Sequence, residues 1–186
     1  EVATKNVDAK SVRFLGKKVP LYSNGQRLEG LMPVPVVQRI GKFRLEFLSG
    51  GDVVLHRALV SVVDAKYLQQ NIRTTKSMRA AKTSDEERKK MAAFRAFLSP
   101  VRLWTMPLQA PVPQCTTSPF GVKRLHDGKF SGNFHGGLDF NSKLGEPVHA
   151  VADGVVKVAE MFSRQGGTVG LDHGQGLQTT YIHLSK

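Results

Sequence analysis

A histidine and an aspartate four residues apart, with two glycines between them, constrain this chain more than any other stretch. His135 and Asp139 stand in the run Phe134-His135-Gly136-Gly137-Leu138-Asp139-Phe140, and imidazole nitrogen and carboxylate oxygen are ordinary zinc ligands. The glycines argue against a helix, and a fully extended strand would separate the two residues by roughly 13 Å. The backbone must therefore bend if both side chains are to reach one ion, and a glycine pair permits that. The alternative is a turn in which Asp139 accepts backbone hydrogen bonds and His135 is a surface residue.

Length, composition and charge narrow the class of protein. The chain has 186 residues, 40% of them apolar, and a formal net charge of +12, so one or two domains with a packed core are expected. No run approaches the roughly 18 apolar residues of a membrane helix. The charge favours an anionic partner such as nucleic acid, anionic lipid or an acidic cell-wall polymer, although a solvated basic surface would also explain it. Nucleic acid is the weakest choice, because there are one Trp and three Tyr and no basic–aromatic motif.

Residues 1–68 predict an antiparallel β-sandwich. Phe43, Leu45 and Phe47 alternate along one face of a predicted strand, and turn residues follow that strand before the next apolar run. His56 falls in this second strand and is interpreted as structural. A segment with two prolines is expected to be irregular or at a sheet edge. The strand candidates are 11–15, 19–22, 41–47 and 53–62, and the irregular segment is 32–35.

Residues 69–103 predict a basic linker with one helix. Between residues 71 and 102 there are nine Lys or Arg and three Asp or Glu. Ser84 followed by Glu87 forms a capping box, which predicts a helix over 85–98 that ends at Ser99-Pro100. Met91, Phe94 and Leu98 would lie on one apolar stripe of that helix. The helix could pack between two domains or lie over a binding groove, and both interpretations stay open.

Residues 104–186 predict a second β-rich domain. Short strands punctuated by glycine are expected at 147–151, 154–159, 168–172 and 177–184. In the last of these, Thr179, Tyr181 and His183 share one face, and Thr180, Ile182 and Leu184 share the other. The second face is apolar and is expected to face the core. His183 would then lie on the more polar side, where a catalytic base or a metal ligand could stand.

Five runs in this order resemble the lysostaphin-type zinc metallopeptidases, which cut peptide bonds in peptidoglycan. The resemblance covers about residues 104–186, and the domain before it resembles the immunoglobulin-like domain of a bacterial envelope subgroup. The implied fold is mainly β: an N-terminal antiparallel β-sandwich (1–68), a linker helix (69–103) and a C-terminal antiparallel β peptidase domain (104–186). The five runs are 120–124, 135–139, 145–156, 172–177 and 181–185.

The resemblance implies a Zn²⁺ cofactor and a role for three residues. His135 and Asp139 match the first two zinc ligands of the family, and His183 matches a catalytic histidine beside the metal-bound water. The third ligand of the family belongs to a later His-x-His motif, and no His-x-His occurs in this sequence. Catalytic zinc usually has three protein ligands, so the sequence is expected to be a truncated form, a form whose remaining strands come from elsewhere, or a degenerate relative. We favour truncation, because a degenerate member would more readily lose His135 or Asp139.

The implied activity is hydrolysis of peptide cross-links in peptidoglycan by a zinc metalloendopeptidase. The peptide stems of peptidoglycan are then the partner, and the location is periplasmic or secreted. The first alternative is a non-catalytic module with the same fold that binds peptidoglycan or activates another hydrolase. Two further alternatives are a lipoyl-type carrier, for which no exposed lysine at a hairpin tip is convincing, and a basic envelope or nucleic-acid adaptor. The remaining histidines, His126, His149 and His173, are interpreted as structural or surface residues.

Overall fold

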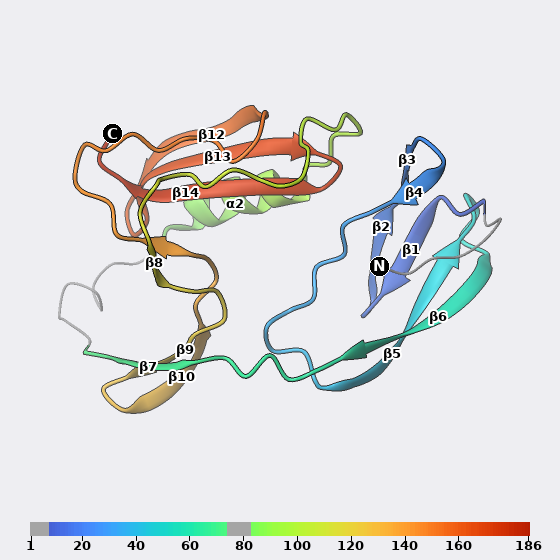
Figure 1. Cartoon of the computed structure of the whole chain (residues 1–186), viewed down its shortest axis with the longest axis horizontal. Coiled ribbons are helices and arrows are strands. Elements are labelled where there is room, and N and C mark those ends of the chain that lie inside the picture. Colours follow the sequence, from blue (N-terminus) through green and yellow to red (C-terminus); the bar gives the residue numbers. More distant parts are fainter. Residues whose placement is uncertain (1–7, 74–82) are drawn as a thin grey trace. The chain divides into compact units, whose positions relative to one another are not determined.

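The computed structural model describes residues 8–73 and 83–186, and these residues form a mainly β protein, as the sequence predicts (Figure 1). The chain divides into two compact units, Glu1–Lys66 and Tyr67–Lys186. Within the described ranges the helix is α2, Asp85–Ala96. No helix in those ranges is long and apolar enough to cross a membrane.

The N-terminal unit is built on a four-stranded antiparallel sheet in the order β2-β1-β5-β6. Its core lies on one face, where Val12, Phe14, Leu45 and Phe47 are buried and Phe43 packs against them. The alternation predicted from the sequence is therefore confirmed. The immunoglobulin-like assignment stays a prediction. The sheet strands are β1 (Ser11–Phe14), β2 (Lys17–Pro20), β5 (Gly41–Leu48) and β6 (Val54–Val62), and β3 (Tyr22–Asn24) pairs with β4 (Arg27–Glu29) in a separate hairpin.

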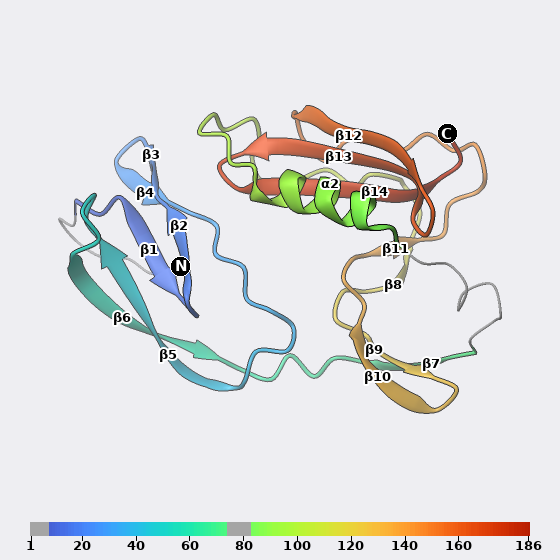
Figure 2. The ribbon, with the colours of Figure 1, turned by 180° about the vertical axis from the view of Figure 1, so that it is seen from behind.

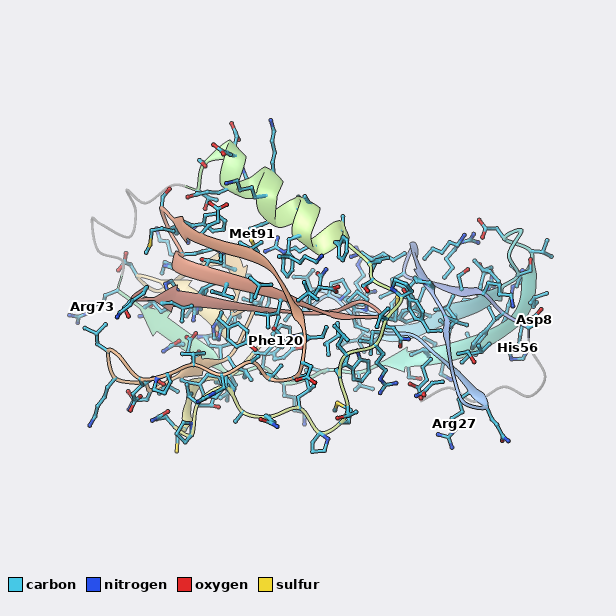
Figure 3. The ribbon with its side chains drawn as sticks, turned by 90° about the horizontal axis from the view of Figure 1, so that it is seen from above. Asp8, Arg27, His56, Arg73, Met91 and Phe120 are labelled. Carbon is cyan, nitrogen blue, oxygen red and sulfur yellow. The ribbon has the colours of Figure 1, made fainter. Side chains whose placement is uncertain are left out.

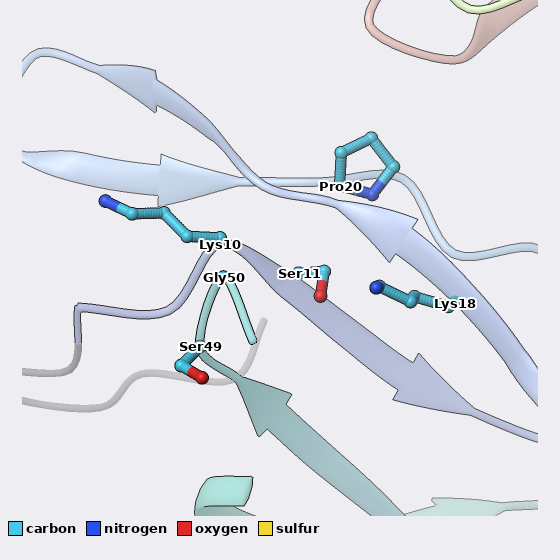
Figure 4. Close-up of a pocket in the computed structure, with 6 residues that line it drawn as sticks. All are labelled: Lys10, Ser11, Lys18, Pro20, Ser49 and Gly50. Atoms are coloured by element: carbon cyan, nitrogen blue, oxygen red, sulfur yellow. The ribbon is translucent and has the colours of Figure 1, made fainter. Parts of the chain in front are cut away.

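A shallow depression of about 300 Å³ lies in this unit beside the start of β1 (Figure 4). Both of its cationic side chains already have acidic partners, because Lys10 pairs with Asp8 and Lys18 pairs with Asp52. The depression is therefore not a free cationic site. Its lining residues are Lys10, Ser11, Lys18, Pro20, Ser49 and Gly50.

The C-terminal unit holds three small sheets and α2 (Figure 2). Their strand orders are β10-β9-β7, β11-β8 and β12-β13-β14, and each pairing is antiparallel except that of β7 with β9. The strands are β7 (Gln69–Ile72), β8 (Thr116–Ser118), β9 (Lys123–His126), β10 (Lys129–Phe134), β11 (Asp139–Phe140), β12 (Val155–Phe162), β13 (Gly166–Gly174) and β14 (Leu177–Leu184).

The capping box predicted at the start of α2 is confirmed. The Ser84 side chain accepts from the backbone N–H of Glu87, and the Glu87 side chain accepts from the backbone N–H of Ser84. Met91 and Phe94 are buried against β12, as the apolar stripe predicts. Leu98 lies beyond the helix and is 53% exposed, so its place in that stripe was predicted wrongly.

Strand β7 shows that the segment 69–103 supplies a sheet strand as well as the helix. Gln69–Ile72 pairs in parallel with β9, in the register Gln69 to Lys123 through Ile72 to His126. Parallel strands need a long crossover connection, and here that connection contains α2. Four mostly polar residues with a partner so distant in the sequence show no alternating apolar pattern. No strand was therefore predicted in this segment.

The strand predicted at 147–151 does not form. His149 N–H donates to Pro111 C=O (2.9 Å), and Gln109 N–H donates to Val151 C=O (2.9 Å). These bonds begin an antiparallel pairing, but Pro111 has no N–H to return the bond to residue 149. The ladder therefore stops after two bonds, and the segment is an irregular loop that runs beside a proline-rich partner.

A chain of hydrogen bonds fixes this loop on the sheet through a wholly buried histidine. His173 Nδ1 lies 2.7 Å from Asp153 C=O, and its Nε2 lies 2.8 Å from Thr179 Oγ1. A carbonyl can only accept, so Nδ1 carries the proton and Thr179 donates to Nε2. The Tyr181 hydroxyl lies 3.3 Å from Thr179 Oγ1 and accepts from Val151 N–H. His173 is thus structural, and it lies within β13.

Candidate metal centre

The backbone of His135 is fixed by the loop that follows β8. Gly121 N–H donates to His135 C=O (2.8 Å), and His135 N–H donates to Val122 C=O (2.8 Å). Gly121 has φ +84°, and a Cβ built there would come within 2.0 Å of the Tyr67 ring. Only glycine fits at this position, so the close approach of Tyr67 and the placement of His135 depend on the same residue.

The imidazole of His135 is buried and held in one tautomer. Its Nδ1 lies 2.9 Å from the backbone carbonyl of Pro119 and 3.1 Å from Ser118 Oγ. Because a carbonyl oxygen only accepts, Nδ1 must carry a proton in this contact. Nε2 of the neutral ring then keeps its lone pair, which is the form in which histidine binds a metal, with its other N–H on a backbone carbonyl.

Asp139 lies opposite that lone pair. The distance between His135 Nε2 and Asp139 Oδ1 is 3.0 Å, and the Asp139 side chain is 48% exposed. The backbone bend predicted between the two residues is therefore confirmed. Gly136 and Gly137 do not adopt left-handed φ, and a Cβ at either would meet nothing within 4 Å. The bend does not require glycine, and the missing side chains leave open space.

The lone pair of His135 Nε2 and the carboxylate oxygen Oδ1 of Asp139 would repel each other at 3.0 Å. A positive charge is therefore needed, either as a proton on the imidazole or as a cation between the two atoms. A protonated imidazole would supply it as an ion pair, and a bound cation would supply it as a shared ligand. One imidazole nitrogen and one carboxylate oxygen are ligand types that zinc accepts, so the residues present fit part of a zinc site. Among the described residues, no group of three His, Cys, Asp or Glu gathers closely enough to hold a metal.

Arg124 on β9 contacts the other oxygen of the same carboxylate. Its Nη2 lies 3.2 Å from Asp139 Oδ2. Asp139 therefore presents one oxygen to the imidazole and the other to a guanidinium. The run 120–124 was recognised in the sequence only as part of a family pattern, and neither Arg124 nor the Ser118–Pro119 contact was predicted. Arg124 and the Ser118–Pro119 segment reach the His–Asp pair only through pairing of strands that are distant in the sequence, so the sequence alone does not place them there.

His183 lies at a bulge in β14 and not on a regular strand face. Its φ is +62°, its backbone N–H donates to Gln165 C=O (2.7 Å), and the register with β13 shifts at this point. The prediction for the two faces was wrong: Thr180 and Ile182 are exposed, whereas Thr179 and Tyr181 are half-buried in the His173 hydrogen-bond chain. The extra residue of a bulge reverses the alternation, so the side chain of His183 is exposed.

The structure brings His135 and Asp139 together, and it places His183 on a different sheet. In Figures 1 and 2, the β8–β11 pair and the C-terminal end of β14 lie at the same end of the three-stranded sheet. His183 forms no group of metal ligands with His135 and Asp139 within the described part of the chain. Its catalytic role stays a prediction.

With this geometry in view, comparison with known proteins identifies the class to which the C-terminal segment is similar. Residues 133–186 match the model of peptidase family M23, and this range includes His135, Asp139 and His183. A solved structure from Pseudomonas aeruginosa, described as a candidate peptidase M23, has a TM-score of 0.67 and 25% identity. The matched region includes 95% of this chain and 67% of the Pseudomonas aeruginosa chain. The resemblance predicted from the sequence is therefore confirmed.

Two relatives show how much of a longer protein is matched. An uncharacterised metalloprotease of Haemophilus influenzae is 45% identical over 71 residues, which are 38% of this chain and 15% of that protein. The peptidoglycan DD-endopeptidase ShyA of Vibrio cholerae is 37% identical over 70 residues, 38% of this chain and 16% of that protein. The matched segment thus spans about a sixth of the length of these relatives.

Proposed function

We propose that this chain is part of a zinc-dependent metalloendopeptidase that hydrolyses peptide cross-links of peptidoglycan in the periplasm or outside the cell. The observation that carries the proposal is the His135–Asp139 pair, in which Nδ1 of the imidazole donates to a backbone carbonyl and Nε2 faces a carboxylate oxygen at 3.0 Å. The match of the surrounding segment to a peptidase family supports it, as does the name of the Vibrio cholerae relative.

In this proposal His135 and Asp139 are two of the protein ligands of the zinc ion. When bound, zinc polarises the scissile carbonyl and makes its water more acidic. Hydrolysis then adds water across one peptide bond, so that the carbonyl carbon gains oxygen and the amine leaves with a proton. The chain's part is to hold the imidazole in one tautomer through Pro119 and to place the Asp139 carboxylate opposite Nε2.

His183 is proposed as the catalytic histidine that exchanges a proton with the attacking water or stabilises charge on the attacked carbonyl. Its exposed side chain and its position at a backbone bulge support this role. Bulges commonly occur beside active sites, where they redirect a side chain. No side-chain contact with His135 or Asp139 is needed for the role, because a substrate would lie between them.

Zinc content per chain tests the metal part of the proposal. The 186-residue protein would be dialysed against a weak chelator, and zinc would be measured by elemental analysis for the wild type, His135→Ala and Asp139→Asn. We expect both variants to lose zinc, because each removes one of the two ligands. His149→Ala is the matched control, since His149 is an exposed histidine of the same unit. Equal zinc in all four proteins would contradict the proposal.

Activity is tested on the 186-residue protein supplied with zinc. Purified peptidoglycan would be digested, and the soluble fragments separated and weighed by mass spectrometry. We expect cleavage between stem peptides, with loss of at least about 100-fold for His183→Ala, which is the size of a general acid–base contribution. Full activity in this variant would remove His183 from the mechanism without affecting the metal ligands.

One observation favours a second candidate, a non-catalytic module that binds peptidoglycan or activates another hydrolase. Within residues 8–73 and 83–186, no group of three metal-ligating side chains assembles, whereas catalytic zinc usually has three. If the protein bound peptidoglycan but neither retained zinc nor released fragments, this candidate would replace the first one.

A further inference from the structure

We infer that Arg124 is a positioning residue for Asp139: it holds one carboxylate oxygen so that the other one is presented to the metal. The inference rests on the proposed function, because it concerns the same ligand pair. The arrangement is a line of three side chains, with the guanidinium and the imidazole on opposite oxygens of one carboxylate.

The two carboxylate oxygens of Asp139 contact different side chains. Oδ2 accepts from Arg124 Nη2 (3.2 Å), and Oδ1 lies 3.0 Å from His135 Nε2. Asp139 is 48% exposed, so burial alone does not fix its rotamer. A carboxylate with one oxygen held by a guanidinium is favoured as a monodentate ligand through the other.

Arg124 is partly buried, and its guanidinium hydrogen-bonds to Asp139. The side chain of Arg124 is 29% exposed, less than that of its partner. Its Nε is buried and has no hydrogen-bond partner among the described residues. A buried donor without an acceptor costs free energy, so an arginine here is a poor choice for stability alone. Its Nη2 bond to Asp139 is directed at the candidate metal centre.

Two effects of Arg124 on metal affinity oppose each other. A guanidinium beside a ligand repels a cation, but this repulsion is weakened because Asp139 is half exposed to water. Loss of a residue that orients a ligand typically costs about 10–100-fold in metal affinity. Positioning should therefore outweigh repulsion, and removal of Arg124 should weaken zinc binding.

The test measures zinc affinity by competition with a chromophoric chelator, using the 186-residue protein and three variants. Arg124→Met removes both the charge and the hydrogen bonds. Arg124→Gln removes the charge and keeps a donor. Arg88→Met is the matched control, because Arg88 forms an exposed ion pair with Asp85 on α2 and its loss changes the net charge equally. Thermal unfolding followed by the single tryptophan checks that each variant folds.

We expect Arg124→Met to bind zinc about 10-fold more weakly than wild type, Arg124→Gln to fall between the two, and Arg88→Met to match wild type. Tighter binding by Arg124→Met would show that repulsion dominates and would overturn the inference. Unchanged affinity in a folded variant would overturn it too.

A second readout needs no metal and separates this inference from the proposed function. Three-bond couplings measured by NMR report the χ1 rotamer of Asp139. We expect one rotamer in the wild type and in Arg88→Met, and averaged couplings in Arg124→Met. If the wild type bound no zinc but Asp139 lost its rotamer in Arg124→Met, the positioning would stand and the metal proposal would fail. If the wild type bound zinc but the Asp139 rotamer were unchanged in Arg124→Met, the metal proposal would stand and the positioning role of Arg124 would fail.

Discussion

At the scale of single residues, the hydrogen-bond chain through His173 ties the stability of the C-terminal unit to individual polar atoms. Thr179→Val keeps the shape of the side chain but leaves Nε2 of a wholly buried imidazole without its donor. We expect the free energy of unfolding to fall by about 1–3 kcal/mol, the cost of an unsatisfied buried group. Urea unfolding followed by Trp104 fluorescence measures it, since Trp104 is the only tryptophan and lies in this unit.

The neighbouring residue provides the control for that measurement. Thr180→Val makes the same chemical change on the same strand, but Thr180 is exposed and takes no part in the hydrogen-bond chain. We expect a change within about 0.5 kcal/mol. Equal destabilisation by both variants would mean that valine disturbs β14 itself and that the His173 contact contributes little.

Much of the candidate site could be predicted at this scale, but its supports could not. His135 and Asp139 are four residues apart, so a local bend was enough to bring them together. Pro119 and Arg124 reach them through β8–β11 and β9–β10 pairing, which the local sequence does not determine. His183 was expected on the polar side and is exposed, but Thr179 and Tyr181, expected on the same face, are half-buried. Strict alternation fails here because a bulge inserts one extra residue.

At the scale of elements, Glu87 joins α2 to the turn between β12 and β13. Its carboxylate accepts from Ser163 N–H (2.5 Å), Ser163 Oγ–H (2.6 Å) and Ser84 N–H (2.8 Å). These hydrogen bonds lower the pKa of Glu87 below its ordinary value near 4.5, and the two from Ser163 have the largest effect. A carboxyl group whose pKa is lower in the folded state stabilises the fold above the ordinary pKa.

The stability contributed by Glu87 should therefore disappear as the pH falls below about 4.5 and through the lowered pKa. We expect Glu87→Gln to be less stable than wild type at pH 7 and to lose less stability between pH 5 and pH 3. Urea unfolding at a series of pH values, again followed by Trp104, measures both. Glu86→Gln is the control, because Glu86 is exposed on the same helix turn. Parallel pH profiles for wild type and Glu87→Gln would contradict the assignment.

The docking of α2 depends on one aromatic side chain. Figure 3 shows α2 lying along one side of the β12–β13–β14 sheet, with Met91 labelled on it. Phe94 is 6% exposed and packs with Val158 and Phe162. We expect Phe94→Ala to destabilise the unit by about 3–5 kcal/mol, measured by urea unfolding.

The control for Phe94 lies three residues further along the chain. Phe97 is 42% exposed and contacts the Lys157 ammonium with its ring. Phe97→Ala removes the same number of atoms from a surface position, so we expect a loss of about 1 kcal/mol or less. A loss as large as that of Phe94→Ala would show that the two rings share the docking of α2.

The helix was predicted well and the sheets less well, for a physical reason. A capping box and a 3.6-residue stripe are contained in one short stretch of sequence. The pairing of β7 with β9 joins residues on either side of α2, and the segment 147–151 failed to form a strand because its partner holds Pro111. Whether each of these segments forms a strand depends on the residues of the partner segment to which it would hydrogen-bond, and not on its own sequence.

At the scale of the whole molecule, the net charge of +12 predicts electrostatic attraction to an anionic polymer. We expect binding to insoluble peptidoglycan to weaken by about an order of magnitude as NaCl is raised from 50 to 500 mM, because salt screens exposed charges. A sedimentation assay measures the bound fraction. Chitin, an uncharged polysaccharide, is the control and should bind little at either salt concentration. Salt-independent binding would contradict an electrostatic contribution.

The parallel pairing of β7 with β9 has a consequence for the order in which the polypeptide becomes available. A chain that emerges from its N-terminus exposes Gln69–Ile72 well before Lys123–His126 exists to receive it. At about 5–20 residues per second, synthesis of the roughly 50 intervening residues takes several seconds. During that interval the strand has an open hydrogen-bonding edge. Three of its four residues are Gln or Asn, so the nascent segment stays hydrated and offers little apolar surface to a wrong partner while it waits.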